Sequence, residues 1–332
     1  MNEKSRGGDE VYERARGNEV EDFLPELLTL HHLSFGTYPG VIPTSEAFLR
    51  WYLERPGLGE ENTLLFLHEG HIVSSLFLTI SAMYWQGGLV PVGIIDTVMI
   101  HPDHRKKGLA SKLIQWAEEV MRERGCRMSL LYTLSDSPPF HLYRSLGYLP
   151  VESVFHLQYL TAHSSPFPFS PRPQPKELIR QFLNASLACF DGFVPLDEDY
   201  FAWRKVKRPP MLPAFLFTVQ GNGMLSSLTL IQGEITTPTH VETVFYLQDF
   251  CGQTRQAKEE LLERVLASLP PQSKVDTLCA PSNEEEWHLF LSRGFRPTLE
   301  EVALIHPLEG EKLELPHSRR PWYPLLESIV GA

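Results

Sequence analysis

The sequence predicts an α/β (α+β) fold arranged as two tandem domains, each with a mixed β-sheet flanked by helices. Three observations predict it. Apolar strands alternate with helices in the first half, a proline-rich segment divides the 332-residue chain nearly in half, and the second half repeats features of the first. Strands interrupted by helices are typical of folds in which helices pack on a sheet. A chain of this length also favours two domains over one compact core.

The first half alternates between segments that favour strands and segments that favour helices. β-rich or strongly apolar stretches predict strands at Thr63–His68, His71–Tyr84, Val92–Ile100, Arg127–Leu134 and Ser153–Leu160. Apolar residues at helical spacing predict helices at Val20–Phe35, Leu109–Arg124 and Pro139–Leu146. Gly125 and Gly147 follow the last two helices and are expected to end them.

The segment Thr161–Pro175 reads TAHSSPFPFSPRPQP. Its prolines lack backbone donors and block helix formation, so we expect an extended linker here. This placement predicts a first domain over residues 1–160, a linker over 161–175 and a second domain over 176–332.

The second half repeats two patterns of the first. The windows Cys126–Tyr148 and Ser273–Phe295 align without a gap, and their identical positions include His141 with His288 and Gly147 with Gly294. A separate match upstream gives Pro43, Phe48 and Trp51 the same spacing as Pro195, Tyr200 and Trp203. Two matches in the same order favour an internal duplication over the patterns that unrelated α/β domains share.

The composition excludes several classes of protein. The net charge of -11 disfavours a nucleic-acid binder and favours small cationic partners. The four cysteines form no metal-binding or disulfide pattern, so no metal is expected and a reducing compartment fits best. The charged N-terminus does not resemble a signal peptide, and no apolar run is long enough to span a membrane. We therefore expect a cytoplasmic protein with no membrane partner.

The segment Ile94–Ala110, IIDTVMIHPDHRKKGLA, carries the strongest chemical signal. An apolar strand runs into a short turn, and Arg105–Ala110 then opens a helix. The first turn of a helix leaves backbone N–H groups without partners at the positive end of the helix dipole, where phosphates bind. Gly108 and Ala110 would let a pyrophosphate approach closely, and the basic run Arg105, Lys106 and Lys107 would add positive charge. Neither a Walker motif nor a GxGxxG fingerprint is present.

This strand, the H-P-D-x-R-x-x-G-x-A run and the following amphipathic helix resemble the signature of the GNAT acetyltransferase superfamily, over about Val11–Leu160. The run Phe140–Tyr148, FHLYRSLGY, resembles a second family signature. The resemblance implies two GNAT-like domains with mostly antiparallel sheets. It also implies an acetyl-CoA-dependent N-acetyltransferase that acts on a primary amine of a small molecule or peptide.

The resemblance also implies a role for each matching residue. Main-chain groups of Val98, Met99 and Ile100 would bind the pantetheine arm of acetyl-CoA. The backbone of Arg105, Lys106, Lys107, Gly108, Leu109 and Ala110 would hold its pyrophosphate. Tyr143 would be the general acid that protonates the departing thiolate, although a core aromatic would fit the same position. A positioned proton donor accelerates such a step by roughly 10²–10⁴-fold.

Asp96 is the candidate general base. A lysine-like amine has a pKa near 10.4 and must lose a proton before it attacks. Asp96 lies two residues before Val98, so in a regular strand the two side chains would share a face. A role in capping or in orienting the substrate is the alternative.

The second copy lacks these features. Its segment Asp249–Ala257, DFCGQTRQA, has no R-x-x-G-x-G/A run, and Phe290 stands where the first copy has Tyr143. We predict that this copy does not catalyse acetyl transfer. It could complete the substrate site, cover the cofactor domain or form a homodimer. The alternative for the whole chain is a non-catalytic acetyl-CoA-binding regulatory or interaction protein.

Overall fold

The computed structural model describes residues 11–21, 23–35, 44–161, 174–221, 224–236, 241–308 and 320–325. In this part of the chain, eleven strands form one continuous sheet in the order β1-β2-β3-β4-β5-β11-β6-β10-β9-β8-β7. Most neighbouring strands are antiparallel, and only the pairs β4/β5 and β9/β10 are parallel. The prediction of a mixed sheet flanked by helices is confirmed. The predicted linker lies almost wholly outside the described residues.

The elements follow the predicted alternation. The strands of the first half are β1 (Glu13–Arg16), β2 (Thr63–His68), β3 (His71–Trp85), β4 (Gly88–Ile100), β5 (Met128–Leu134) and β6 (Leu149–Leu160). Those of the second half are β7 (Ala214–Gly221), β8 (Met224–Thr236), β9 (Val241–Gly252), β10 (Lys274–Cys279) and β11 (Arg296–Pro307). The α-helices are α1 (Phe23–Phe35), α2 (Glu46–Leu53), α3 (Leu109–Glu123), α4 (Pro138–Ser145), α5 (Lys176–Leu187), α6 (Glu198–Lys205), α7 (Arg255–Ser268) and α8 (Glu284–Ser292). Short 3-10 turns occupy Gly17–Glu19, Glu60–Asn62 and Pro102–His104.

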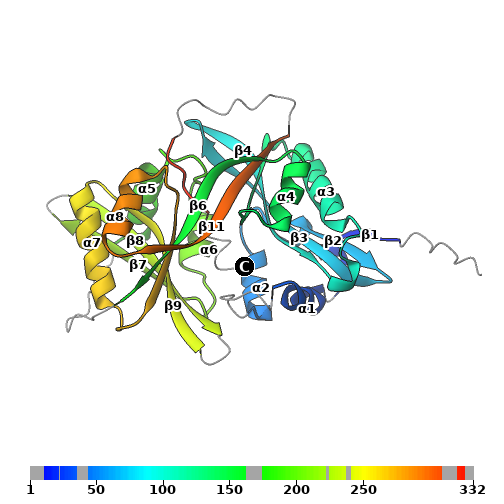
Figure 1. Cartoon of the computed structure of the whole chain (residues 1–332), viewed down its shortest axis with the longest axis horizontal. Helices are drawn as coiled ribbons and strands as arrows, with labels where there is room; N and C mark the ends of the chain where they lie inside the picture. The colour runs from blue at the N-terminus through cyan, green and yellow to red at the C-terminus, as the bar shows by residue number, and fades with distance from the viewer. Residues whose placement is uncertain are drawn as a thin grey trace, which may run out of the picture.

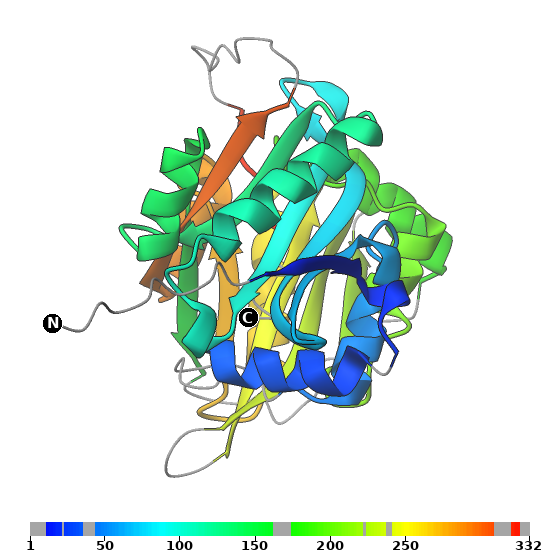
Figure 2. The same cartoon turned by 90° about the vertical axis from the view of Figure 1, so that its right-hand side faces the viewer.

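The helices cover both faces of the sheet. On one face, α1, α2, α5 and α6 contribute to a single apolar cluster that joins the two halves. On the other face, α3 and α4 cover the first half and α7 and α8 cover the second half, each pair with its own cluster. Figure 1 shows α3 and α4 on the opposite side of β1, β2 and β3 from α1 and α2, and Figure 2 shows the strands of the first half between α1, in blue, and α3. The amphipathic spacing of these helices explains it, because each buries one apolar stripe against the strands.

The two halves exchange their last strands. Strand β11, from the second half, pairs with β5 over Glu301–Pro307, while β6, from the first half, pairs with β10 over Phe155–Leu160. The exchanged strands also pair with each other and lie at the centre of the molecule in Figure 1. The sequence predicts a sheet in each half, and the structure joins the two into one.

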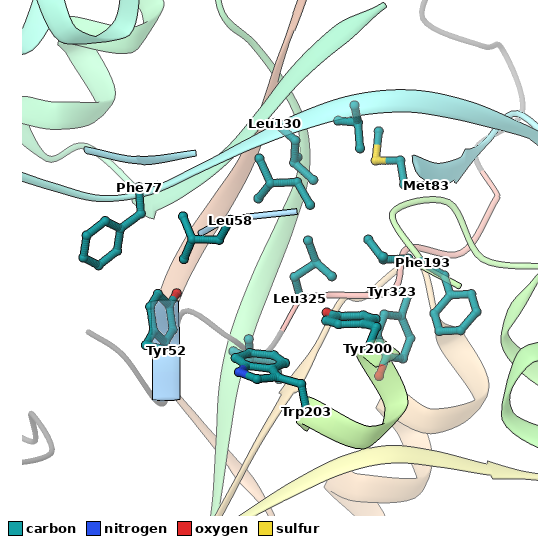
Figure 3. Packing of buried hydrophobic residues seen from close by; sticks show 14 of the residues in the cluster. Tyr52, Leu58, Phe77, Met83, Leu130, Phe193, Tyr200, Trp203, Tyr323 and Leu325 are labelled. Carbon is teal, nitrogen blue, oxygen red and sulfur yellow. The ribbon is translucent and has the colours of Figure 1, made fainter. Parts of the chain in front are cut away.

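The repeated aromatic residues meet where the halves pack together. The rings of Trp51 and Trp203, which share a position in the sequence repeat, stack 4.7 Å apart and 6° from parallel. The indole nitrogen of Trp203 donates a hydrogen bond of 2.8 Å to the backbone oxygen of Trp51. Figure 3 shows Tyr52 of α2 and Trp203 of α6 in the same cluster as Tyr323 and Leu325. The faces of the two halves therefore share one core rather than a polar domain interface.

None of the helices in the described ranges is both long and apolar enough to cross a membrane.

Candidate active site

Strands β4 and β5 separate from each other part of the way along the sheet. They pair in parallel only over Val92–Ile94 and Met128–Leu130. Beyond Ile94 no described strand pairs with the β5-facing edge of β4, so the backbone groups on this edge are available to a ligand. The predicted pantetheine contacts at Val98, Met99 and Ile100 lie along this stretch. An extended ligand arm can bind there by adding to the strand edge.

A bulge in β4 accompanies the separation. Phe77 of β3 faces Asp96 and Ser75 faces Met99, so two residues of β4 lie opposite one residue of β3. Thr97 has a φ of 52°, a left-handed conformation that is unusual for a β-branched residue. Strained residues of this kind cluster at functional sites.

The bulge overturns one expectation about Asp96. In a regular strand Asp96 and Val98 would share a face, but the extra residue shifts the alternation. Asp96 instead shares its face with Met99, whose side chain belongs to the apolar cluster on the α1 side of the sheet. Val98 packs against the cluster on the α3 side. That prediction was wrong because sequence spacing alone does not reveal a bulge.

The carboxylate of Asp96 is held by partners inside the protein. Its Oδ2 forms an ion pair of 2.5 Å with Arg55, and its Oδ1 accepts a hydrogen bond of 2.9 Å from Thr97. The Arg55 side chain is only 4% exposed and also donates to Thr79. A carboxylate has about four lone-pair positions, so Asp96 retains positions that can accept from a water or an amine.

The loop before α3 presents the basic run to solvent. Arg105, Lys106, Lys107 and Gly108 are exposed, whereas Leu109 is buried and anchors the first turn of α3. Arg105 is also tied to β4, because its Nε donates to the backbone oxygen of Ile100. Gly108 is the N-cap residue of α3, and no side chain there occupies the first-turn N–H groups. Helix termini of this kind bind anions.

Gly108 has the conformation that this loop requires. Its φ of 78° lies in the left-handed region, and a Cβ added to it would meet no atom within 4 Å. The space beside Gly108 is therefore open to a ligand rather than filled by the protein. This is the property expected of a glycine that a phosphate group must approach.

Tyr143 lies on α4, which packs against β5. It is 7% exposed, packs against Tyr148 and lines a cavity together with Leu131–Leu134 of β5. Among the described residues its hydroxyl has no hydrogen-bond partner. Burial raises the pKa of this hydroxyl to about 12, so Tyr143 keeps its proton at neutral pH. It combines the two properties of a general acid, a proton and access to the cavity.

A cavity of about 750 Å³ connects these residues with the second half of the chain. Its wall on the first half includes Asp96, Thr97 and Val98 of β4 together with Tyr143. Its wall on the second-half side carries polar residues from the exchanged strands and from β10, namely His156, Gln158, Lys274, Asp276, Thr298 and Glu301. The sequence predictions missed this second wall. His156 and Gln158 alternate with apolar residues along β6, which is the signal that would have marked them.

The second copy has the same bulged and separated strands, but the loop before its helix α7 is not open to a ligand. Strand β9 carries a bulge at Asp249, whose φ is 51°, and β9 separates from β10 beyond Leu247. Only Gln253 and Thr254 lie between β9 and α7, and the Thr254 side chain accepts a hydrogen bond from a first-turn N–H of α7. A Cβ on Gly252 would lie 2.6 Å from the Lys258 side chain, so the space beside this glycine is filled.

A distant segment of the chain lies beside β9 and the residues that follow β10. The segment 320–325 enters here, and the backbone N–H of Trp322 donates to the Ser282 hydroxyl at 3.1 Å. The Tyr323 hydroxyl donates to Asp249, which also pairs with Arg204 and Lys205. Burial raises the pKa of Asp249, but these two cations outweigh burial and lower it to about 2. A buried ion-pair network and a chain segment thus fill the position that stays open in the first copy.

Comparisons with known proteins agree with this geometry. The family model described as an acetyltransferase (GNAT) domain matches residues 18–151. A glucosamine 6-phosphate N-acetyltransferase of Trypanosoma brucei brucei is 36% identical over 97 residues, which are 29% of this chain and 64% of that protein. The chain therefore covers less than two thirds of this relative.

Solved structures share the fold over nearly the whole chain. The N-myristoyltransferase of Saccharomyces cerevisiae, solved with bound myristoyl-CoA, has a TM-score of 0.69 at 12% identity, covering 92% of this chain and 81% of that one. A GCN5-related N-acetyltransferase from Anabaena variabilis ATCC 29413 has a TM-score of 0.61 at 17% identity, covering 90% and 73%. At these identities the likeness shows the fold alone. The family match is confined to residues 18–151, which resemble a GNAT acetyltransferase domain.

Proposed function

We propose that this protein transfers an acetyl group from acetyl-CoA to a primary amine of a small molecule or peptide. The observation that carries the proposal is that the unpaired edge of β4 lies between the open N-terminus of α3 and the cavity that Tyr143 lines, a path for acetyl-CoA. The GNAT domain match and the activity named for the trypanosomal relative support it.

Each end of the path has a defined task. The first-turn N–H groups of α3 and the exposed Arg105 and Lys106 stabilise the pyrophosphate, because the helix dipole and the basic charges both favour an anion. The backbone groups of Val98 on the unpaired edge of β4 hold the pantetheine arm. The thioester then lies at the cavity, where the acceptor amine reaches it.

The reaction forms one bond and breaks one. The neutral amine attacks the thioester carbonyl, and the tetrahedral intermediate collapses as the C–S bond breaks. Tyr143 donates its proton to the leaving sulfur. Because a thiol has a pKa near 8.5, its thiolate is a tolerable leaving group, and this proton transfer accelerates the step without being indispensable.

Asp96 is the proposed acceptor of the amine proton, directly or through a water. Replacing it with asparagine keeps its shape and removes its charge. We expect kcat/KM to fall about 100-fold, within the range for general-base catalysis.

An unchanged kcat/KM would show that Asp96 only positions Arg55 and the bulge. The melting temperature of Asp96→Asn should be recorded alongside, because the buried Arg55 side chain loses its charged partner.

The experiment that tests the function is a screen of primary amines with acetyl-CoA, read by the release of free thiol. Calorimetric titration of the full chain with acetyl-CoA should run beside it, and we expect one site per chain because the second copy is filled. Binding with no thiol release for any amine would favour a non-catalytic acetyl-CoA-binding regulator. Two equivalent sites would contradict the assignment of the second copy as inactive.

A further inference from the structure

The cavity has two walls of different character. Its far wall, built by β6, β10 and β11, carries the polar residues described above. The wall where β4 and β5 separate is apolar. Ile94 is the last residue of β4 that pairs with β5, and Tyr132 lies two residues beyond its partner Leu130. Ile94 belongs to the apolar cluster on the α1 side of the sheet, Tyr132 packs against that cluster, and both residues line the cavity.

The segment 320–325 completes this apolar wall. The indole N–H of Trp322 and the backbone N–H of Leu325 both donate to the Tyr132 hydroxyl, at 3.0 Å and 3.4 Å. Trp322 is buried and packs edge-on against the ring of Trp85. These contacts hold Leu325 beside Tyr132, where it lines the cavity.

Two residues of the second half lie beside the same segment. Val194 lines the cavity, and the residue before it, Phe193, accepts a backbone hydrogen bond of 2.9 Å from β3. Tyr200 also lines the cavity, and its helix α6 reaches the segment through Arg204, which donates to the Tyr323 hydroxyl at 3.5 Å. Figure 3 shows Tyr200 and Leu325 in one cluster. We define the apolar subsite as Ile94, Tyr132, Val194, Tyr200 and Leu325.

The apolar subsite contains no charged residue. Among the described residues that line the cavity, Arg55 and Asp96 pair with each other, and Asp197 accepts from a first-turn N–H of α6. The other charged residues of this lining lie on the far wall. A polar substituent at the apolar subsite would lose its water without gaining a charged partner, and this is costly. An apolar substituent gains free energy by leaving water.

We propose that the acceptor carries an apolar group, branched alkyl or aromatic, a few carbons from its amine, and that the apolar subsite binds this group during acetylation. The proposal rests on the proposed function, because it assigns the acceptor of that same reaction. In that function the thioester lies where β4 and β5 separate, beside Ile94 and Tyr132, so one short molecule can reach both. The proposal also separates this chain from the trypanosomal relative, which is named for a phosphorylated amino sugar.

The test compares amines of equal charge that differ at the far end. Initial rates of thiol release are measured with 3-methylbutylamine, 3-aminopropan-1-ol and glucosamine 6-phosphate. We expect kcat/KM for 3-methylbutylamine to exceed that for the amino alcohol about tenfold or more, because each buried CH₂ group contributes about fourfold. Glucosamine 6-phosphate should react no better than the amino alcohol.

Substitutions at Leu325 localise the effect. Leu325→Ala should lower kcat/KM for 3-methylbutylamine about tenfold, because the ligand loses apolar contacts, and should leave the amino alcohol nearly unchanged. Leu325→Phe provides a second measurement if the alanine variant folds poorly. Its larger side chain should exclude 3-methylbutylamine and spare ethylamine, which is too short to reach it.

The matched control is Leu89→Ala. Leu89 lies on β4 but is 55% exposed and does not line the cavity. The control makes the same substitution outside the cavity, so we expect wild-type kinetics with both amines.

The outcomes distinguish the two proposals. Equal kcat/KM values for 3-methylbutylamine and the amino alcohol would overturn this inference and leave the acetyltransferase function standing. The same would follow if Leu325→Ala lowered activity toward both amines equally, or if glucosamine 6-phosphate were the best acceptor. Faster transfer to ethylamine from hexanoyl-CoA than from acetyl-CoA, lost in Leu325→Phe, would assign the subsite to the acyl group and overturn it too. Absence of thiol release with every amine would overturn the proposed function, and this inference with it.

Discussion

Replacement of Gly108 by glutamate should abolish binding of acetyl-CoA. The new carboxylate would occupy the open space beside the N-terminus of α3, where we place the pyrophosphate. Like charges about 4 Å apart near a protein surface repel by roughly 4 kcal/mol, which corresponds to about a thousandfold in Kd. Calorimetric titration with coenzyme A measures this change directly.

A matched glycine separates the effect of charge from backbone strain. Gly125, just past the C-terminal end of α3, also has a positive φ, 74°, and open space where a Cβ would lie. Gly125→Glu therefore introduces the same side chain and a similar strain, on the order of 1–2 kcal/mol, at the opposite end of α3 from the loop. We expect it to retain wild-type affinity. A folded Gly108→Glu protein with wild-type affinity would mean that the phosphate site lies elsewhere.

The second large effect concerns Tyr143. Tyr143→Phe keeps the ring and its packing and deletes the hydroxyl, so the fold should change little. Removing a proton donor that acts only in the transition state lowers kcat and kcat/KM together. We expect a loss of roughly 10- to 1,000-fold, because the thiolate can still leave unaided, with coenzyme A affinity nearly unchanged.

Tyr148 provides the control for this substitution. It is fully buried, and its hydroxyl lies 2.7 Å from that of Ser129 rather than on the cavity wall. Tyr148→Phe should lower the melting temperature through the lost hydrogen bond and leave kcat intact. If Tyr143→Phe retained wild-type kcat on the best amine, Tyr143 would be a packing residue, and the non-catalytic alternative would gain support.

The raised pKa of Tyr143 also has a consequence for pH dependence. Burial stabilises the neutral phenol, so the proton-donating form persists up to a pH near 12. The rate should therefore not decline on the alkaline side through ionisation of this residue within an ordinary assay range.

Local patterns in the sequence predicted most helices and strands, because each pattern depends only on the residues within one segment of the chain. The apolar periodicity of Leu109–Glu123 predicts a helix, and the glycine that follows predicts where it ends. Neither prediction depends on which other segments pack against the helix. Even so, strand β4 begins at Gly88, four residues before the predicted start, because pairing with β3 extends it to the hairpin turn.

The order of the strands in the sheet could not be predicted in the same way. Alternation along β6 and β11 predicts strands with two faces, but it does not say which strands lie beside them. The exchange depends on pairing between segments more than a hundred residues apart. The far wall of the cavity was missed for this reason, since Asp276, Glu301 and His156 meet only after the exchange. The bulge at Thr97 was missed because no glycine marks it.

The exchange of strands also has a consequence for how the chain folds as it is made. Strand β5 is held to β4 only over Met128–Leu130, and its longer pairing is with β11, which is synthesised last among the described strands. While the first half is the only part outside the ribosome, β5 and β6 present unpaired edges, which invite association with other chains. Pairing of such distant segments is intrinsically slow. The docking of β11 between β5 and β6 therefore completes both halves in a single late event, after translation has passed residue 307.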